Sequence, residues 1–415
     1  MTSKYYDIII IGSGISGLYS AYNIKNSNAN TSFLILEKYK KDWIGGRTSN
    51  DFFYGTEIVT GAGIGRKNKD KLLINLLSEL NLPISEYNIN PSYSKTMVPL
   101  DIKKTLHYLR KEYKKLKDKD KQLTFKHFAI GVLGENLYKR FIISAGYTDY
   151  ENEDAYETLY HYGFEDNACC WTAFHVPWKK MVLKLFRYIG EKHFKFSSKV
   201  IEINKLRDTP CEFQVNIENG DQYLCNKVII ASTIDTVRKL LPNLNIYNDI
   251  EPQPFLRLYA KFDKKSIPLL QKYIKGFTFV PGPLQRIVPM DPNNGVYMIA
   301  YNDNKNTIIL KDYLKNTREN RKLYEILLER SLGIPENSLH IIALKDYYWP
   351  IGTHYYKPLN KRLYDSREDF ISKAQKPENG ILVVGEAVSR NQGWTQGALE
   401  SVEAVLTKKW IKNQC

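Results

Sequence analysis

The first 37 residues contain the pattern that most restricts the fold of this chain. Residues Tyr6–Ile11 form a nearly continuous run of β-branched residues, which is typical of a parallel strand buried on both faces. A GxGxxG sequence follows at once, with its glycines at Gly12, Gly14 and Gly17. Apolar residues then recur at helical spacing, and Ser32–Leu36 has the composition of a second strand that ends at Glu37. This order of strand, glycine turn, helix, strand and acid predicts a βαβ unit.

Such a unit is suited to bind a dinucleotide. The first glycine allows the tight turn, the second lets the backbone approach a pyrophosphate, and the third lets helix and strand pack closely. The helix N-terminus, at Ile15 and Ser16, offers free N–H groups and a positive dipole end to phosphate. Glu37 lies 20 residues beyond Gly17, where an acid binds the ribose, and Lys38 follows it. An acid at this position favours an unphosphorylated ribose.

A second glycine motif follows the acid, and it consists of Gly45, Gly46, Arg47 and Thr48. Paired glycines let the backbone pass close to a cofactor, and the arginine offers a planar guanidinium to phosphate oxygens. An acid at a strand end followed by GGR-[ST] resembles the signature of the flavin-containing amine oxidase family. The resemblance implies FAD as the cofactor.

Further motifs of that family follow in the family's order. One resembles the glycine-rich stretch that passes beside the isoalloxazine ring, and it consists of Gly61, Ala62, Gly63 and Ile64. Val200 lies where the family contacts adenine through the backbone, within an expected strand from Phe194 to Ile203. The last motif is a strand that ends in a GE pair, followed by an aromatic residue, a glycine and an alanine. It comprises Gly385, Glu386, Trp394, Thr395 and Ala398.

Apolar residues beyond Thr395 recur every three or four positions, which predicts an amphipathic helix from about Thr395 to Trp410. The N-terminus of this helix would stabilise the negative charge that a reduced flavin has on its pyrimidine side.

The spread of the motifs predicts an α/β fold with two domains. We expect a Rossmann-like FAD-binding domain assembled from residues 1–75, 192–246 and 376–415. The insertions at residues 76–191 and 247–375 would form a mixed α+β substrate-binding domain. Within them, periodicity predicts a helix at Ile102–Leu116, strands at 255–262, 295–301 and 339–345, and a helix at 317–332.

The resemblance also implies a chemistry. In the family, a neutral amine sits between two aromatic rings and loses a hydride equivalent to the flavin; the imine hydrolyses, and oxygen reoxidises the flavin to give hydrogen peroxide. Trp394 matches one aromatic wall. The other wall matches His354 or Tyr355, and a hydrogen-bonded packing role is the alternative for His354. Thr353 stands where monoamine oxidases have the cysteine that attaches the flavin, so we expect non-covalent FAD.

Several positions depart from the family pattern. Arg257 stands where a lysine often holds a water beside the flavin, and an arginine stays protonated, so it can steer charge but cannot act as a base. Lys261 lies on the same strand face. Trp178 and Val402 occupy positions where glycine is common. These changes indicate an altered site.

Three functions are compatible with these patterns. The first is an FAD-dependent amine oxidase that acts on a small amine and oxygen. The second is an L-amino-acid oxidase or a desaturase of the protoporphyrinogen or phytoene type; an amino-acid oxidase needs a cation for the carboxylate, and Arg257, Arg66 and Arg286 are available. The third is a flavoprotein with a structural or interaction role and reduced activity.

The composition of the chain limits which binding partners and which cellular compartment we expect. The chain has 60 basic and 45 acidic residues, which gives a net charge of +15, but these charges are spread along the sequence. The abundance of Lys, Asn, Ile and Tyr resembles the codon bias of an AT-rich genome, such as that of a large DNA virus or a low-GC microbe. Nucleic acid is therefore not the expected partner. Five scattered cysteines indicate a reducing compartment and no zinc site. With no signal peptide or membrane anchor in the sequence, we expect a cytoplasmic protein. The oligomeric state stays open.

Overall fold

The computed structural model describes residues 4–27, 30–164, 171–206 and 213–412. Cys225 is a buried free thiol. The other cysteines, Cys169, Cys170, Cys211 and Cys415, lie outside the described residues.

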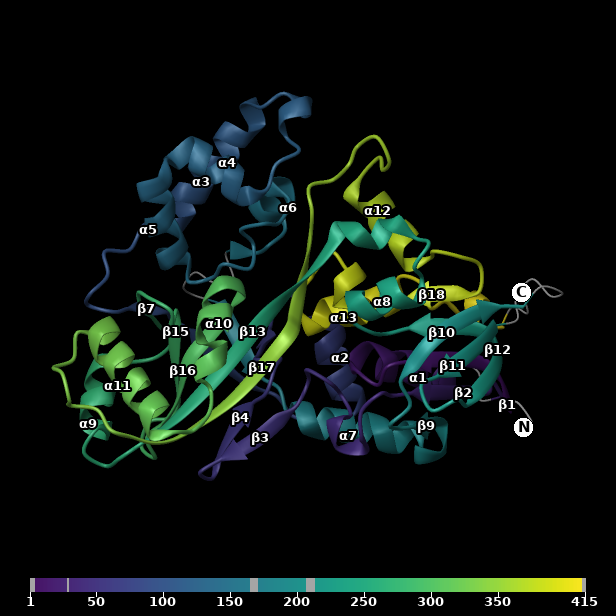
Figure 1. Ribbon diagram of the computed structural model, residues 1–415, viewed down its shortest axis with the longest axis horizontal. Helices are drawn as coiled ribbons and strands as arrows, with labels where there is room; N and C mark the ends of the chain where they lie inside the picture. The colour runs from purple at the N-terminus through teal and green to yellow at the C-terminus, as the bar shows by residue number, and fades with distance from the viewer. Residues whose placement is uncertain (1–3, 28–29, 165–170, 207–212, 413–415) are drawn as a thin grey trace.

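A seven-stranded sheet forms one side of the molecule (Figure 1). Its strands come from three distant parts of the chain: β1 (Lys4–Ile11), β2 (Phe33–Leu36), β9 (Phe194–Lys195), β10 (Val200–Lys205), β11 (Phe213–Ile217), β12 (Gln222–Ile230) and β18 (Ile381–Val383). The order is β10-β11-β12-β1-β2-β9, and β18 pairs with the end of β12. Strands β9, β2, β1, β12 and β18 are mutually parallel, so their carboxyl ends meet at one edge. The predicted βαβ unit is confirmed.

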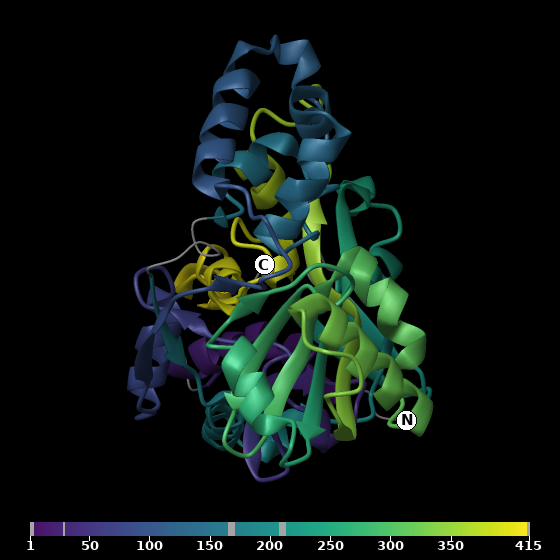
Figure 2. The ribbon, with the colours of Figure 1, turned by 90° about the vertical axis from the view of Figure 1, so that its left-hand side faces the viewer.

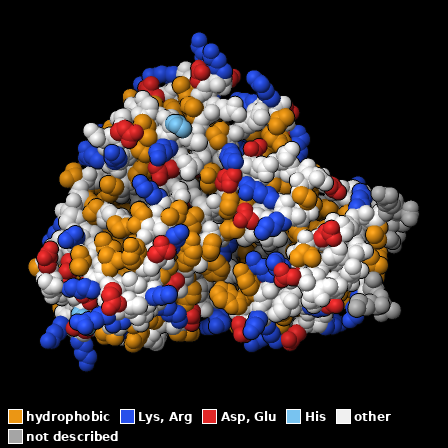
Figure 3. Space-filling model, in the orientation of Figure 1, with side chains coloured by type: hydrophobic (Ala, Val, Ile, Leu, Met, Phe, Trp, Pro, Cys, Tyr) orange, Lys and Arg blue, Asp and Glu red, His pale blue; other side chains and the backbone are white. Residues whose placement is uncertain are grey.

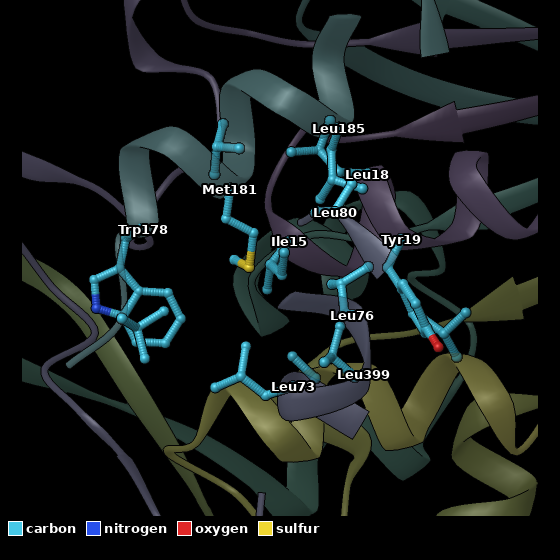
Figure 4. Packing of buried hydrophobic residues seen from close by; sticks show 14 of the residues in the cluster. Ile15, Leu18, Tyr19, Leu73, Leu76, Leu80, Trp178, Met181, Leu185 and Leu399 are labelled. Carbon is cyan, nitrogen blue, oxygen red and sulfur yellow. The ribbon is translucent and has the colours of Figure 1, made fainter. Parts of the chain in front are cut away.

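Both faces of this sheet are buried, which explains the apolar run in β1. Ile8 and Ile10 pack into one core, and Ile9 and Ile11 into the other. The first core contains α1 (Ile15–Ser27), α2 (Lys71–Glu79), α7 (Trp178–Ile189) and α13 (Thr395–Glu403), whose side chains converge in Figure 4. The second contains α8 (Ile234–Leu240) and α12 (Arg367–Gln375).

Two expected elements are interrupted. The single strand expected from Phe194 to Ile203 is wrong, because the chain leaves the sheet between β9 and β10, where Ser197 has a φ of +51° and Ser198 donates to the carbonyl oxygen of Glu37. The helix expected from Thr395 to Trp410 ends at Glu403, and a short helix, α14 (Lys408–Lys412), follows.

A six-stranded sheet forms the other side of the molecule, in the order β17-β13-β16-β15-β14-β7. Its strands are β7 (Ser92–Tyr93), β13 (Ile250–Phe262), β14 (Thr278–Phe279), β15 (Arg286–Asp291), β16 (Val296–Asp303) and β17 (Ile341–Tyr356). Helices α9 (Ile267–Tyr273), α10 (Asn304–Leu310) and α11 (Arg318–Leu332) contribute to the core on one face. The expected strands and helix of this region are confirmed, and β17 continues to Tyr356, further than periodicity indicated.

A group of helices projects above the second sheet (Figure 2). It comprises α3 (Ile102–Lys115), α4 (Phe125–Leu133), α5 (Glu135–Ala145) and α6 (Ala155–Tyr160), which share an aromatic-rich core of their own. A three-stranded sheet of β5 (Gly65–Arg66), β6 (Ser85–Ile89) and β8 (Trp171–His175) and a hairpin of β3 (Asn50–Phe53) and β4 (Thr56–Val59) complete the fold. Among the helices of the described residues, none has the length and apolarity that a bilayer crossing requires.

The division into two domains stays a prediction. Helices α7 and α12 lie within the ranges that we assign to the substrate-binding domain, yet both pack into cores of the seven-stranded sheet.

Candidate functional site

The glycine turn after β1 leaves space beside one of its three motif glycines. A Cβ atom on Gly12 would lie 2.4 Å from the carbonyl oxygen of Ala231, and one on Gly17 would lie 2.0 Å from that of Gly12. A Cβ atom on Gly14 would meet no atom within 4 Å. Gly12, with a φ of +107°, and Gly17 are therefore required for packing. Gly14 borders open space at the N-terminus of α1, as a bound pyrophosphate requires.

Glu37 ends β2 and holds the glycine turn. One carboxylate oxygen accepts hydrogen bonds from the backbone N–H and the hydroxyl of Ser13, at 2.7 and 2.8 Å, and the other accepts from the N–H of Tyr39 at 2.9 Å. Because an ionised carboxylate has about four acceptor sites, Glu37 keeps capacity for a ribose hydroxyl. Lys38 and Val200, the first residue of β10, lie at the same end of the site.

The Gly45–Thr48 motif lies directly against the glycine turn. Gly45 forms a parallel bridge with Gly14 and donates to the carbonyl oxygen of Ser13 at 3.0 Å. Gly45 and Gly46 have φ values of +90° and +58°, a conformation that favours glycine. The hydroxyl of Thr48 donates to the carbonyl oxygen of Gly45 at 2.6 Å and closes the turn.

Arg47 and Glu386, which are 339 residues apart, form a partly buried ion pair at 3.0 Å. Arg47 also donates to the carbonyl oxygen of Gly352, and Glu386 accepts from the N–H of Gly393 at 3.0 Å. Burial would raise the pKa of Glu386, but the contact with His354 and the charge of Arg47 outweigh burial and lower the pKa to about 2. Glu386 is therefore ionised at neutral pH and ties the Arg47 turn to the segment before α13.

His354 does not present a free ring to the site. Its Nδ1 lies 2.5 Å from Glu386, and its Nε2 accepts from the backbone N–H of Ile234 at 3.3 Å. Both ring nitrogens are engaged and the side chain is fully buried. These contacts agree with hydrogen-bonded packing, and the choice between His354 and Tyr355 as the second aromatic wall stays a prediction.

Tyr355 lies on the opposite face of β17 from His354, because successive residues of a strand alternate. It is half-buried and lines the site. Thr353 shares that face and lies beside Gly393, where a Cβ atom would be 3.5 Å from the Thr353 methyl group.

Trp394 is the residue before α13, and one face of its ring is covered by a cation. The Arg66 guanidinium lies 3.7 Å from the ring centroid, which is a cation–π distance. Asp70 holds Arg66 through hydrogen bonds of 2.9 Å to Nε and 2.7 Å to Nη2, and both side chains are buried. We did not predict the pairing of Arg66 with Asp70, although their i,i+4 spacing is a signal that could have shown it.

The Gly61–Ile64 stretch passes under Arg257. A Cβ atom on Gly61 would lie 2.2 Å from the carbonyl oxygen of Arg47, so this segment packs on the arginine turn. Arg257 donates from Nε and Nη2 to the carbonyl oxygen of Gly61, at 3.2 and 2.9 Å. Lys261, the weaker candidate on the same strand, instead binds the carbonyl oxygen and side chain of Asn294.

The start of α13 faces the start of α1. The hydroxyl of Ser16 donates to the carbonyl oxygen of Ala398 at 3.4 Å. Gly385, with a φ of +132°, donates its N–H to the hydroxyl of Ser401 at 2.7 Å. Thr395 is the first residue of α13 and is partly exposed to the site.

One cavity of about 1720 Å³ joins these parts. Of the site residues predicted from the motifs, all except Gly17 line it, whereas the further candidates Lys261 and Arg286 do not. At one end lie the glycine turn, Glu37 and Val200, and at the other lie Trp394, Tyr355 and Arg257. The glycine cradle, the open α1 N-terminus and the acid at the end of β2 suit the diphosphate and ribose of FAD.

The structure adds residues that no sequence motif marked. Tyr147, Asp149 and Tyr301 line the cavity from the loop after α5 and from β16. The hydroxyl of Tyr162 donates to Asp149 at 2.5 Å, and burial and the charge of Asp303 raise the pKa of Asp149 to about 7. These residues come from elements that are far apart in the sequence and meet only in the folded protein. The spacing of residues along the chain therefore could not reveal them.

The sequence matches, over residues 15–404, the family described as flavin containing amine oxidoreductase. No curated protein matches the chain. Among solved structures, a double mutant of putrescine oxidase has a TM-score of 0.74 and 14% identity, with 97% of this chain and 100% of that chain covered. Putrescine oxidase bound to putrescine has the same TM-score and identity, with 97% and 99% covered. At such low identity these two structures show a common fold, and the predicted α/β fold is confirmed.

Proposed function

Because the chain belongs to the family of flavin-containing amine oxidoreductases and is an FAD-dependent oxidoreductase, we propose that it oxidises a small amine to an imine with oxygen as the final electron acceptor. The observation that carries the proposal is the continuous cavity. Its motif-lined end suits a dinucleotide, and its aromatic end leaves room for a small molecule beside the Gly61–Ile64 stretch.

The motif-lined end supplies cofactor binding through the backbone. The N–H groups at the start of α1, at Ile15 and Ser16, would bind the diphosphate, Glu37 would accept from the ribose, and the backbone near Val200 would contact adenine. Thr353 has no thiol, so the cofactor is held without a covalent bond. When bound, FAD would supply the oxidant for removal of a hydride equivalent from the carbon next to nitrogen, with oxygen as the final electron acceptor and hydrogen peroxide as its product.

The aromatic end positions the amine. The free face of Trp394 and the ring of Tyr355 form the walls between which a neutral amine lies, since Arg66 covers the other face of Trp394. A cation behind the ring opposes a positively charged ligand in front of it, so Arg66 favours the uncharged amine. Arg257 keeps its proton and orients charge beside Gly61.

The arrangement also supports the two-domain division. In this proposal residues 1–75, 192–246 and 376–415 bind FAD, and residues 76–191 and 247–375 bind the substrate. The cavity then lies at the junction of the two domains, where ligand sites commonly occur.

The test is reduction of the bound flavin. The purified protein is expected to show an oxidised-flavin spectrum, and acid precipitation should release FAD into the supernatant. Under anaerobic conditions, one member of a panel of primary amines, secondary amines and amino acids should bleach the flavin band, and admitting oxygen should restore the band and produce hydrogen peroxide. A bound flavin that no amine reduces would contradict the proposal, as would a protein that binds no FAD.

A further inference from the structure

The excess of basic residues is greatest in one stretch of the chain. Residues 101–140 contain 12 basic and five acidic residues, a net charge of +7, which is nearly half of the +15 of the whole chain. This stretch includes α3, α4 and the first part of α5, and it belongs to the helical group that stands out from the two sheets (Figure 1 and Figure 2). The excess positive charge therefore lies mainly on a projecting part of the molecule.

The outer face of α3 carries much of this charge. The exposed residues of the helix are all Lys, His or Tyr, and we call them the basic face of α3: Lys103, Lys104, His107, Tyr108, Lys111, Lys114 and Lys115. The helix has one acidic residue, Glu112, which pairs with Lys115 at 2.6 Å. Among the described residues, no carboxylate pairs with the other four lysines of this face. The basic face is thus a surface of one sign with little internal neutralisation.

The opposite side of α3 is already covered. Leu106, Leu109 and Tyr113 are buried in the core that α3 shares with α4, α5 and α6. The helix of 14 residues is about 21 Å long, and its exposed residues recur at the three- and four-residue spacing that places them on one side. With its apolar side occupied, α3 cannot insert into a partner, and its basic face is left to contact an extended anionic surface.

Exposed apolar groups accompany the lysines. Val98, three residues before the N-cap Asp101, is 79% exposed, and its carbonyl oxygen accepts from Nη2 of Arg140 at 3.4 Å. Tyr108 is 46% exposed and lies one turn from both Lys104 and Lys111. The headgroup region of a bilayer favours aromatic and apolar side chains that are flanked by lysine and arginine. The phosphates of a nucleic acid would neutralise the same lysines but would give Val98 no apolar contact.

We propose that the basic face of α3 binds the surface of an anionic phospholipid bilayer. The lysines would lie against the headgroups, with Tyr108 and Val98 at the boundary between headgroups and acyl chains. Binding of this kind is peripheral and needs no membrane-spanning segment. The inference is independent of the proposed function, because none of the residues that line the cavity comes from α3.

Sedimentation with lipid vesicles tests the inference on the purified full chain. The protein should bind phosphatidylcholine vesicles that contain roughly one-third phosphatidylserine about 10-fold or more tightly than vesicles of phosphatidylcholine alone, and added salt should weaken the binding. A variant with both Lys104→Gln and Lys111→Gln should lose about 10- to 30-fold of this affinity, since each lysine near an anionic surface contributes a factor of about 5. Glutamine has nearly the helix propensity of lysine, so the thermal unfolding should not change.

The matched control removes the same charge elsewhere. Lys408 and Lys409 are exposed residues of α14, near the C-terminus, which lies away from the helical group in Figure 1. A variant with both Lys408→Gln and Lys409→Gln should lose less than about 2-fold of the vesicle affinity, because charges beyond a Debye length of the contact are screened. Equal losses in the two double variants, or equal binding to the two kinds of vesicle, would overturn the inference.

A second pair of measurements separates a membrane from a nucleic acid. Val98→Ser should weaken binding to the anionic vesicles by about 3- to 10-fold, as expected for loss of a partly buried apolar side chain. Fluorescence anisotropy with a labelled DNA duplex and a labelled RNA provides the comparison. If either nucleic acid binds more tightly than the anionic vesicles, and the Lys104 and Lys111 variant weakens that binding, the basic face serves a nucleic acid and the inference falls. Vesicle affinity that Val98→Ser leaves unchanged would also contradict the proposed contact.

Discussion

The two ends of the cavity are built by different means. At the cofactor end, the ligand-facing groups are backbone N–H groups and glycines in turns, and the one acid, Glu37, is fixed by three hydrogen bonds to neighbouring segments. At the aromatic end, the groups are side chains from β13, β16, β17 and the segment before α13. Their charges differ in pairing: Arg66 pairs with Asp70, whereas none of the carboxylates among the described residues forms an ion pair with Arg257.

This difference shows which end is fixed by the fold and which is free to determine specificity. A backbone cradle recognises a chemical group that is common to all dinucleotides, so its requirements are local and general. Side chains on long strands can change without disturbing the main-chain hydrogen bonds. Arg257, one of the departures from the family pattern, lies at the aromatic end. Over the two sheets on the face in Figure 3, basic side chains are interspersed with acidic ones, so this part of the surface has no single-sign patch that would compete with the cavity for a charged ligand.

The largest expected effect is at the aromatic end. Asp70→Asn removes the buried carboxylate charge that pairs with Arg66, which should lower the free energy of unfolding by about 3 to 5 kcal/mol. Urea unfolding measures the loss. The control is Asp51→Asn, which breaks the more exposed pair with Lys345 and should cost at most about 1 kcal/mol. Equal losses would show that the Arg66 pair is no more important than a surface pair.

The second effect concerns pH at the junction of the two ends. The pKa of Glu386 falls from 4.5 to about 2 on folding, so its contribution is present above pH 4.5 and disappears as the pH falls from 4.5 toward 2. The shift corresponds to about 3 kcal/mol. The stability difference between wild type and Glu386→Gln, measured by urea unfolding, should therefore be largest above pH 4.5 and shrink below it. A difference that is independent of pH would contradict the assigned ion pair.

At the cofactor end, Gly14→Val should separate binding from folding. A side chain there meets open space in the protein but occupies the position beside the α1 N-terminus, so FAD affinity should fall roughly 10- to 100-fold, the equivalent of one or two lost charge-assisted hydrogen bonds. The thermal unfolding of the apoprotein should change little. Gly12→Val is the comparison: with a φ of +107° and a backbone oxygen at 2.4 Å, it should destabilise the apoprotein itself.

The smallest effect tests the wall formed by Trp394. Trp394→Phe keeps an aromatic face and should change kcat/KM for the best substrate by less than about 5-fold, whereas Trp394→Ala should lower it by roughly 10-fold, since a ring contact is worth about 1 kcal/mol or more. Steady-state kinetics with matched flavin content make the comparison. Equal activity of the two variants would show that the ring does not contact the substrate.

Much of the molecule follows from the sequence. The buried run before Gly12 predicted a parallel central strand, and the heptad-like spacing from Ile102 predicted α3, because periodicity directly reports which faces are buried. The same reasoning failed where chain direction changes without a glycine or proline signal, as at Ser197. It also left His354 undecided, since alternation places it on one face of a strand but does not show what that face contacts.

The sequence alone determined the dinucleotide cradle of this protein, because the glycine turn, the helix N-terminus and the acid at the end of β2 are held within 37 consecutive residues and act through backbone geometry. Tertiary structure alone decided how the charges at the other end are paired. Arg47 pairs with Glu386, Arg66 covers Trp394, and Arg257 binds the carbonyl oxygen of Gly61, all through contacts between segments far apart in the chain. Pairing depends on distances of a few ångströms between side chains, and such distances exist only after the sheets have packed.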